Sequence, residues 1–480
     1  MIKMNSVQRI VKNISVSGIS QILLSILGFF FLIYIARYLG ESEFGVYSFA
    51  ISFTSLFVIF ADLGISQFII REIARNKEIT SEYISNSLIV KFLLSIVTFI
   101  LIALTINIMG YPQEVINIVY LFSIYTILSS FAQIFMSVFQ AFENMEYTAI
   151  ALISEKIILI PLGFFVLILG YGLLELAYVY VIAAILKVII SVIITLLKIS
   201  TPTTKIDFKI SKMLTIKSLP FGLNVMFATF FFQIDTVLLS IFKGNIAVGV
   251  YSAAYNPLLS LSSVVSGVVT SAIYPVMSRY FITSKDSLET FTVLSSKYLA
   301  IIGFPISFGC LILADKFIAL FYAGQYTQSI LAFQILAVFI PIRLLSSITS
   351  TFLTSINRQG IRTTTIFLGA IFNILLNLIL IPYISYIGAC IATVLSELFL
   401  YLLYIHFINK YFKKINLNNI LLKPFLASLI MGISIFILRD LNLFLIIILA
   451  ILVYFTSLML LKTFTKEDKH ILKEIMNKKA

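Results

Sequence analysis

Ionisable side chains stand inside long apolar stretches of this 480-residue chain, and their chemistry is that of charge held away from water. Lys187, Arg343 and Glu397 lie nearest the middle of such stretches, and the neighbours Glu155 and Lys156 lie in another. A charge at the centre of a membrane helix costs about 2.5–3.5 kcal/mol, so it is expected to face protein or a wet cavity. The set indicates either a substrate-binding cavity whose cations hold an anionic group, or structural ion pairs such as Glu397 with Arg343.

Further polar residues in the apolar stretches add a hypothesis of an ion site. Asp235 lies within one stretch and Asp62 near the end of another, and each is a candidate to bind a coupling Na⁺ or H⁺. Gln21 and Asn224 are candidates for lining the cavity, although amides within membrane helices more often join one helix to another. Lys91 lies close to the end of its stretch, and we expect its long side chain to reach the interface.

Sequence patterns of catalytic, cofactor and metal sites are missing from the chain. It has no G-x-x-x-x-G-K-[ST] phosphate loop and no G-x-G-x-x-G. Its two cysteines fall in or beside apolar stretches, and its two histidines, His406 and His470, are far apart in sequence. No loop on the outer side is long enough for the active site of a transferase. We therefore expect no enzyme activity, no cofactor and no metal site.

The elements that must position these residues are transmembrane helices. The chain is 60% hydrophobic and 11% charged, whereas a soluble domain carries about 25% charged residues. A spanning helix needs roughly 20 mostly apolar residues, and about fourteen windows of that size follow one another. They are placed at 14–35, 45–66, 86–108, 115–139, 148–170, 172–197, 216–241, 246–273, 291–314, 328–352, 362–382, 384–408, 419–438 and 441–461. The predicted fold is an all-α polytopic membrane protein.

The basic residues predict the orientation of the chain. If the N-terminus is cytoplasmic, 28 of the 34 Lys and Arg residues lie on the inner side, 4 on the outer side and 2 within spans. Positive residues collect on the cytoplasmic side of membrane proteins. We therefore expect both termini in the cytoplasm and the protein in the cytoplasmic membrane. The net charge of +13 is then a topology signal that also attracts anionic membrane lipids, and not a sign of nucleic-acid binding.

A duplication divides the chain into two halves. Gly40, Gly45, Val46 and Tyr47 recur 204 residues later, where the sequence again reads Gly, Gly, Val and Tyr over 244–251. The copies are six spans apart, so the halves have the same orientation, and in parallel repeats of this kind the ligand site lies between them. We predict an N-terminal lobe at 1–199, a C-terminal lobe at 200–410, and two extra helices with a basic tail at 411–480.

Several segments in order resemble a known family. They are IARYLGESEFGVYSFA (35–50), ADLGISQFIIREIAR (61–75), FQAFENMEYTAI (139–150), SLPFGLNVMFATFFFQIDTVLLS (218–240) and VGVYSAAYNPL (248–258). Together with the span layout, they make the chain similar to polysaccharide flippases, called Wzx-type, of the multidrug/oligosaccharidyl-lipid/polysaccharide exporter superfamily. The resemblance implies two six-helix lobes around a central cavity, and the passage of a lipid-pyrophosphate-linked oligosaccharide to the outer leaflet by alternating access. It also implies glycan-assembly enzymes as partners.

The first span departs from one group of flippases in this superfamily, and a different kind of exporter is an alternative function. Flippases of peptidoglycan precursors in this superfamily carry arginines in their first span, but 14–35 has no charged residue, which disfavours that substrate. The alternative is a cation-coupled multidrug exporter of the related multidrug and toxic compound extrusion (MATE) type. Such exporters usually have twelve spans, and the cavity for an organic cation should be dominated by acids, whereas the mid-depth set here has two cations and one acid.

Overall fold

A computed structural model describes residues 6–203, 206–413 and 418–464, and every regular element in these ranges is a helix. Ten of the helices are long and apolar enough to cross a membrane, and Leu421–Ile437 is a shorter apolar helix. The chain is therefore an all-α, multi-pass membrane protein, as predicted. The number of fourteen spans stays a prediction, and the basic tail from 465 onward lies outside the described residues.

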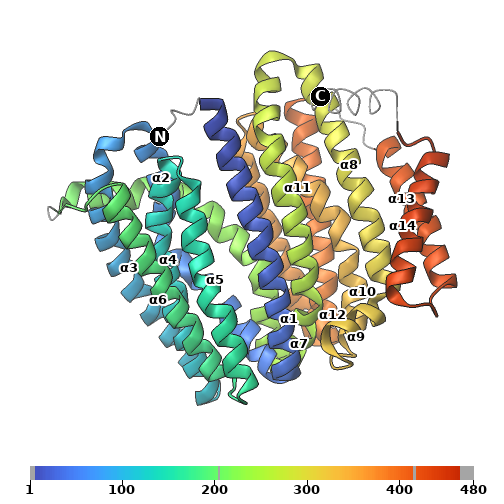
Figure 1. Ribbon diagram of the computed structural model, residues 1–480, viewed down its shortest axis with the longest axis horizontal. Helices are drawn as coiled ribbons and strands as arrows, with labels where there is room; N and C mark the ends of the chain where they lie inside the picture. Colours follow the sequence, from blue (N-terminus) through green and yellow to red (C-terminus); the bar gives the residue numbers. More distant parts are fainter. Residues whose placement is uncertain (1–5, 204–205, 414–417, 465–480) are drawn as a thin grey trace. The chain divides into compact units, whose positions relative to one another are not determined.

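The chain forms two compact units, and their helices are labelled in Figure 1. The first unit comprises Met1–Ala253 and Ile366–Ala389, and the second comprises Ala254–Thr365 and Cys390–Ala480. Unit 1 holds α1 (Ser6–Asp62), α2 (Ile65–Arg75), the short 3₁₀ helix η1 (Lys77–Ile79), α3 (Thr80–Ile108), α4 (Gln113–Ala141), α5 (Met145–Ile168), α6 (Leu173–Lys198) and the first part of α7 (Phe208–Thr283). The division into lobes at 199 and 410 stays a prediction.

Unit 2 contains the later helices. They are the rest of α7, α8 (Lys285–Ile312), α9 (Ala314–Tyr322), α10 (Ser329–Ala337), α11 (Phe339–Ser355), the two ends of α12 (Gln359–Tyr411), α13 (Asn418–Ile437) and α14 (Leu443–Leu460). The last two helices share an apolar core with α8, where Tyr454 donates a hydrogen bond of 2.8 Å to the carbonyl of Ile301. The interruption between α10 and α11 has a local cause. Pro341 has no backbone N–H, so it cannot donate a hydrogen bond to the carbonyl of Ala337.

The duplication seen in the sequence recurs in the backbone of unit 1. Helices α1 and α7 are each interrupted by a glycine in a left-handed conformation, Gly40 with φ 74° and ψ 177° and Gly244 with φ 78° and ψ −176°. Glycine takes such angles without the steric cost that a side chain would add. Both breaks have the same geometry at positions 204 residues apart, so the repeated sequence produces a repeated turn.

The two repeated segments also contact each other reciprocally. A Cβ atom on Gly45 would lie 1.9 Å from the carbonyl oxygen of Asn245, and one on Gly249 would lie 1.9 Å from that of Glu41. The same offset of 204 relates both pairs of residues, so each copy presents the same surface to the other, as in a two-fold contact. Only glycine lets the two backbones approach this closely.

Candidate functional site

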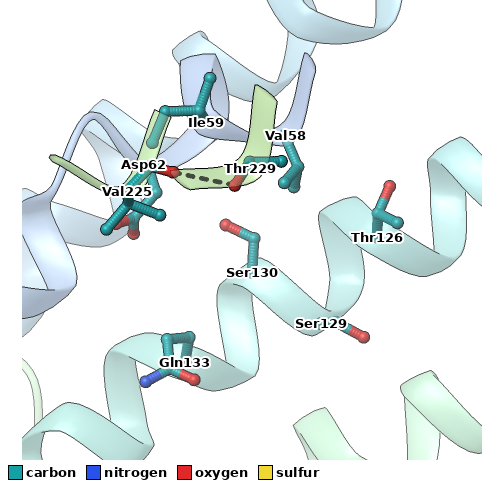
Figure 2. A pocket seen from close by; sticks show the side chains of 9 residues that line it. All are labelled: Val58, Ile59, Asp62, Thr126, Ser129, Ser130, Gln133, Val225 and Thr229. Atoms are coloured by element: carbon teal, nitrogen blue, oxygen red, sulfur yellow. Dashed lines mark hydrogen bonds between the residues drawn. The ribbon is translucent and has the colours of Figure 1, made fainter. Parts of the chain in front are cut away.

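A polar face of α4 lines a cavity inside unit 1 (Figure 2). The cavity has a volume of about 280 Å³, and α4 contributes residues three or four apart, which fall on one face of a helix. The opposite wall comes from the end of the second half of α1 and from the first part of α7. The lining residues are Val58, Ile59 and Asp62 of α1, Thr126, Ser129, Ser130 and Gln133 of α4, and Val225 and Thr229 of α7.

One buried ion pair stands at the edge of this cavity. Lys91 on α3 is fully buried, and its Nζ lies 2.5 Å from Asp62 Oδ1 and donates to the carbonyl of Ser130 at 2.6 Å. Ser66 donates a second hydrogen bond to Asp62 Oδ1 at 2.6 Å. Asp62 itself is 23% exposed and faces the cavity. The expectation that Lys91 reaches the interface is wrong, because a carboxylate and a carbonyl satisfy the ammonium inside the bundle.

A second buried pair joins α5 and α6. Lys187 Nζ lies 2.5 Å from Glu155 Oε2, and the side chains of both residues are 5% exposed. Tyr125 donates to the other carboxylate oxygen at 2.8 Å, and Lys187 also donates to the hydroxyl of Ser129 at 2.9 Å. Every charged atom of this pair therefore has a hydrogen-bond partner, which is the condition for keeping an ion pair away from water.

The two buried lysines, Lys91 and Lys187, donate hydrogen bonds to consecutive residues of α4. Lys91 reaches the carbonyl of Ser130, and Lys187 reaches the hydroxyl of Ser129. Both positive charges thus lie close to the polar face of α4, but each is balanced by its own carboxylate. Among the nine lining residues, Asp62 is the one that carries a charge. The cavity of unit 1 therefore has a mixed lining of apolar and polar side chains that includes no cation.

The remaining candidates of unit 1 differ in their surroundings. Lys156 is half-buried, and the described residues provide it with no ion-pair partner within 4 Å, whereas its sequence neighbour Glu155 is paired with Lys187. Gln21 is exposed on α1, and Asn224 is half-buried on α7, one position before the cavity residue Val225. The structure therefore does not bring Gln21 or Lys156 into the lining of this cavity.

Asp235 forms a separate polar cluster with α12 and the second half of α7. The buried carboxylate accepts hydrogen bonds from Asn377 Nδ2 at 2.7 Å and from the hydroxyl of Tyr251 at 3.1 Å. Asn377 also donates to the side-chain oxygen of Asn373 at 3.1 Å. Four oxygen- and nitrogen-bearing side chains thus converge in an otherwise apolar part of unit 1, and Asp62 does not belong to this group.

The candidates of unit 2 form their own ion pair. Arg343 on α11 lies 3.6 Å from Glu397 Oε1 on α12, with the arginine side chain 23% exposed and the glutamate fully buried. Ser346, one turn after Arg343, donates a hydrogen bond to the same carboxylate. The pairing of Arg343 with Glu397 is the arrangement that sequence reasoning offered as the structural alternative to a substrate-binding role.

Sequence reasoning missed the residues that shape the cavity. The α4 residues of the lining are uncharged, so a search for ionisable side chains within apolar stretches does not find them. They are Thr126, Ser129, Ser130 and Gln133. A signal for them existed, because a stripe of hydroxyl and amide side chains at helical spacing within an apolar span predicts a polar helix face. Their partners on α1 and α7 could not be found in this way, since those helices are far apart in the chain.

Long apolar helices whose internal charges are paired define a polytopic membrane protein. A family model described as polysaccharide biosynthesis protein matches residues 10–281. The chain belongs to that family.

Two curated proteins are similar to most of the chain. The probable low-salt glycan biosynthesis flippase Agl15 of Haloferax volcanii is 25% identical over 382 residues, which cover 79% of each chain. An uncharacterized membrane protein of Methanocaldococcus jannaschii is 24% identical over 459 residues, 90% of each chain.

Solved structures share the fold. The lipid II flippase MurJ in an inward closed conformation is similar with a TM-score of 0.70 and 17% identity, covering 92% of this chain and 97% of that one. An inward-facing multidrug resistance transporter of the MATE family and MOP superfamily has a TM-score of 0.66 and 17% identity, covering 83% and 98%. At these identities the likeness concerns the fold alone.

Proposed function

We propose that this protein is a flippase that moves a lipid-pyrophosphate-linked oligosaccharide across the cytoplasmic membrane by alternating access, for the assembly of a surface glycan. Membership of the polysaccharide biosynthesis family is the observation that carries the proposal. The hydroxyl, amide and carboxylate groups on the cavity lining support it, because a sugar chain needs hydrogen-bond partners that the lipid tails cannot supply. Membrane lipids hold the carrier's tail, and glycan-assembly enzymes supply or consume the substrate.

The anionic headgroup requires cations, and three remain candidates. Lys187 and Arg343 each have a carboxylate partner, so they can bind a phosphate only by exchanging that partner for it. Lys156 has no such competitor within 4 Å among the described residues and is half-buried. We therefore assign the first contact with the pyrophosphate to Lys156, whose sequence neighbour Glu155 is paired with Lys187.

Asp235 is our candidate for coupling to Na⁺ or H⁺. Carboxylate and amide oxygens are ligands that hard cations prefer, and Asp235 lies with Asn373 and Asn377 in one buried cluster. The two lobes at 1–199 and 200–410, the extra helices at 411–480, and both termini in the cytoplasm complete the proposal. The distribution of Lys and Arg supports this orientation.

The test is transport by the purified protein in vesicles. Lipid-linked oligosaccharide is placed in liposomes with and without the protein, and a membrane-impermeant glycosidase added outside reports how much glycan is accessible. Without the protein, the glycosidase cleaves only the glycan in the outer leaflet. With the protein, we expect nearly all of the glycan to be cleaved. Cleavage that stops at the outer-leaflet fraction, with correctly inserted protein, would refute the proposal.

A cation-coupled multidrug exporter is the second candidate, because Asp62 is the charged residue of the cavity lining. A carboxylate there suits an organic cation. Lys91 already balances that carboxylate at 2.5 Å, which weakens the attraction. Efflux of organic cations by the same vesicles, without movement of lipid-linked glycan, would favour this alternative.

A further inference from the structure

We infer that the cavity of unit 1 between α1, α4 and α7 is a subsite for one uncharged sugar ring of the substrate, and that it excludes the phosphate headgroup. The inference rests on the proposed function, since it names the part of the lipid-linked oligosaccharide that this cavity binds. It begins with Ser130, which is nine-tenths buried and has no hydrogen-bond partner for its hydroxyl in the described part of the chain. Figure 2 shows that hydroxyl pointing into the cavity, toward Asp62 and Thr229.

A buried hydroxyl without a partner costs free energy, so its retention needs a reason. Serines in helices commonly donate to the carbonyl four residues earlier, as Ser137 does on the same helix to Gln133 at 2.8 Å. Ser130 makes no such bond, although its backbone carbonyl accepts from Lys91. Its hydroxyl is therefore available to a ligand in the cavity.

The polar groups around the cavity match a molecule that both donates and accepts hydrogen bonds. Ser130 and the carboxamide of Gln133 do both. Thr126 and Thr229 donate to backbone carbonyls of their own helices, which leaves their oxygens as acceptors. Both side-chain hydrogen bonds to Asp62 end on Oδ1, so Oδ2 retains capacity to accept. Sugar hydroxyls fit this mixture, because each donates one bond and accepts others.

A phosphate fits the same cavity poorly. It is an acceptor at neutral pH, and acceptor groups outnumber donors in the lining. The charged group in the lining is the Asp62 carboxylate, which can only accept hydrogen bonds and so offers a phosphate no donor. The ammonium groups of Lys91 and Lys187 each lie 2.5 Å from a carboxylate oxygen, so their charges are already balanced.

The size and the apolar wall complete the match. A volume of about 280 Å³ lies just below the ~300–1,000 Å³ that small-molecule sites occupy, which suits a single ring. Val58, Ile59 and Val225 provide an apolar wall. The C–H face of a sugar ring can pack there while its hydroxyls turn to α4.

The experiment measures binding of simple probes to the full chain in lipid nanodiscs, by saturation-transfer NMR. Detergents with sugar headgroups are left out, because they would occupy the site. The probes are the methyl glycosides of glucose, galactose and N-acetylglucosamine, with methyl glucuronide as the matched anionic ring and inorganic pyrophosphate as the headgroup. We expect saturable binding of at least one neutral glycoside, at least tenfold weaker binding of the glucuronide, and no competition by pyrophosphate.

Two variants place the binding in this cavity. Ser130→Ala and Gln133→Leu each remove hydrogen-bonding groups of the lining, and we expect each to weaken the neutral glycoside about fivefold to tenfold. Ser137→Ala removes a hydroxyl from the same helix outside the lining, and its affinity should equal that of the parent protein.

Three results would overturn the inference. They are no saturable binding of any neutral glycoside, equal affinity in Ser130→Ala, Gln133→Leu and Ser137→Ala, and displacement of the glycoside by pyrophosphate. The vesicle assay separates this outcome from failure of the proposed function. Active glycan transport without glycoside binding removes the subsite alone, and glycoside binding without glycan transport removes the flippase function.

Discussion

Replacing Lys187 by methionine leaves the Glu155 carboxylate buried without its counter-charge. Both side chains are 5% exposed and their charged atoms lie 2.5 Å apart, so solvent screening does not reduce the effect. Removing one partner of a buried ion pair typically costs about 3–5 kcal/mol, because the remaining charge has lost its compensation. We expect Lys187→Met to lose stability by that amount, and surface glycan to fall with it.

The double variant Glu155→Gln with Lys187→Met separates stability from transport. It removes both charges and keeps similar volumes, and exchanges of this kind are often neutral or stabilising. If the pair is structural, the double variant recovers both thermal stability in nanodiscs and surface glycan in a strain that lacks the native gene. If Lys187 binds the substrate, stability recovers and glycan does not.

An exposed ion pair provides the matched control. Lys413 Nζ lies 2.8 Å from Glu289 Oε2, and the lysine side chain is 60% exposed. Exposed pairs contribute little to stability because water and salt screen them, so Lys413→Met should change the unfolding midpoint little. The reasoning would be refuted if Lys187→Met were as stable as Lys413→Met, because burial would then not set the cost of the lost partner.

Three further predictions concern other parts of the fold and the site. Gly249→Ala brings a Cβ to 1.9 Å from the Glu41 carbonyl oxygen, so we expect loss of folded protein in size-exclusion profiles. Gly110→Ala is the control: its Cβ would have nothing within 4 Å, so it should lose only the stability that a side chain costs at a φ of +70°. Asp235→Asn should weaken the dependence of transport on an Na⁺ or H⁺ gradient in vesicles, and an unchanged dependence would make this carboxylate structural. Lys156→Met should reduce glycan transport at least tenfold with little loss of stability, and full transport would remove it from headgroup binding.

The apolar windows of the sequence were enough to predict that the chain lies in a lipid bilayer and folds as transmembrane helices. A backbone N–H or C=O without a hydrogen-bond partner costs several kcal/mol in lipid. Apolar stretches of this length therefore form helices, however the helices pack against one another. The duplication was also readable, because Gly40 and Gly244 each begin a local sequence that is repeated at one fixed offset. Their equal left-handed turns follow from local sterics, which the sequence specifies.

The partners of the internal charges depended on the tertiary structure. Lys91 and Asp62 are 29 residues apart, Lys187 and Glu155 are 32 apart, and nothing local tells a lysine whether it meets a carboxylate, a phosphate or the interface. Pairing depends on which helix faces are neighbours, and in lipid many faces are equally apolar. The sequence thus located the charges by depth. Packing decided that apolar, hydroxyl and amide side chains with one acid line the cavity of unit 1, and that Lys91 and Lys187 each pair with a carboxylate.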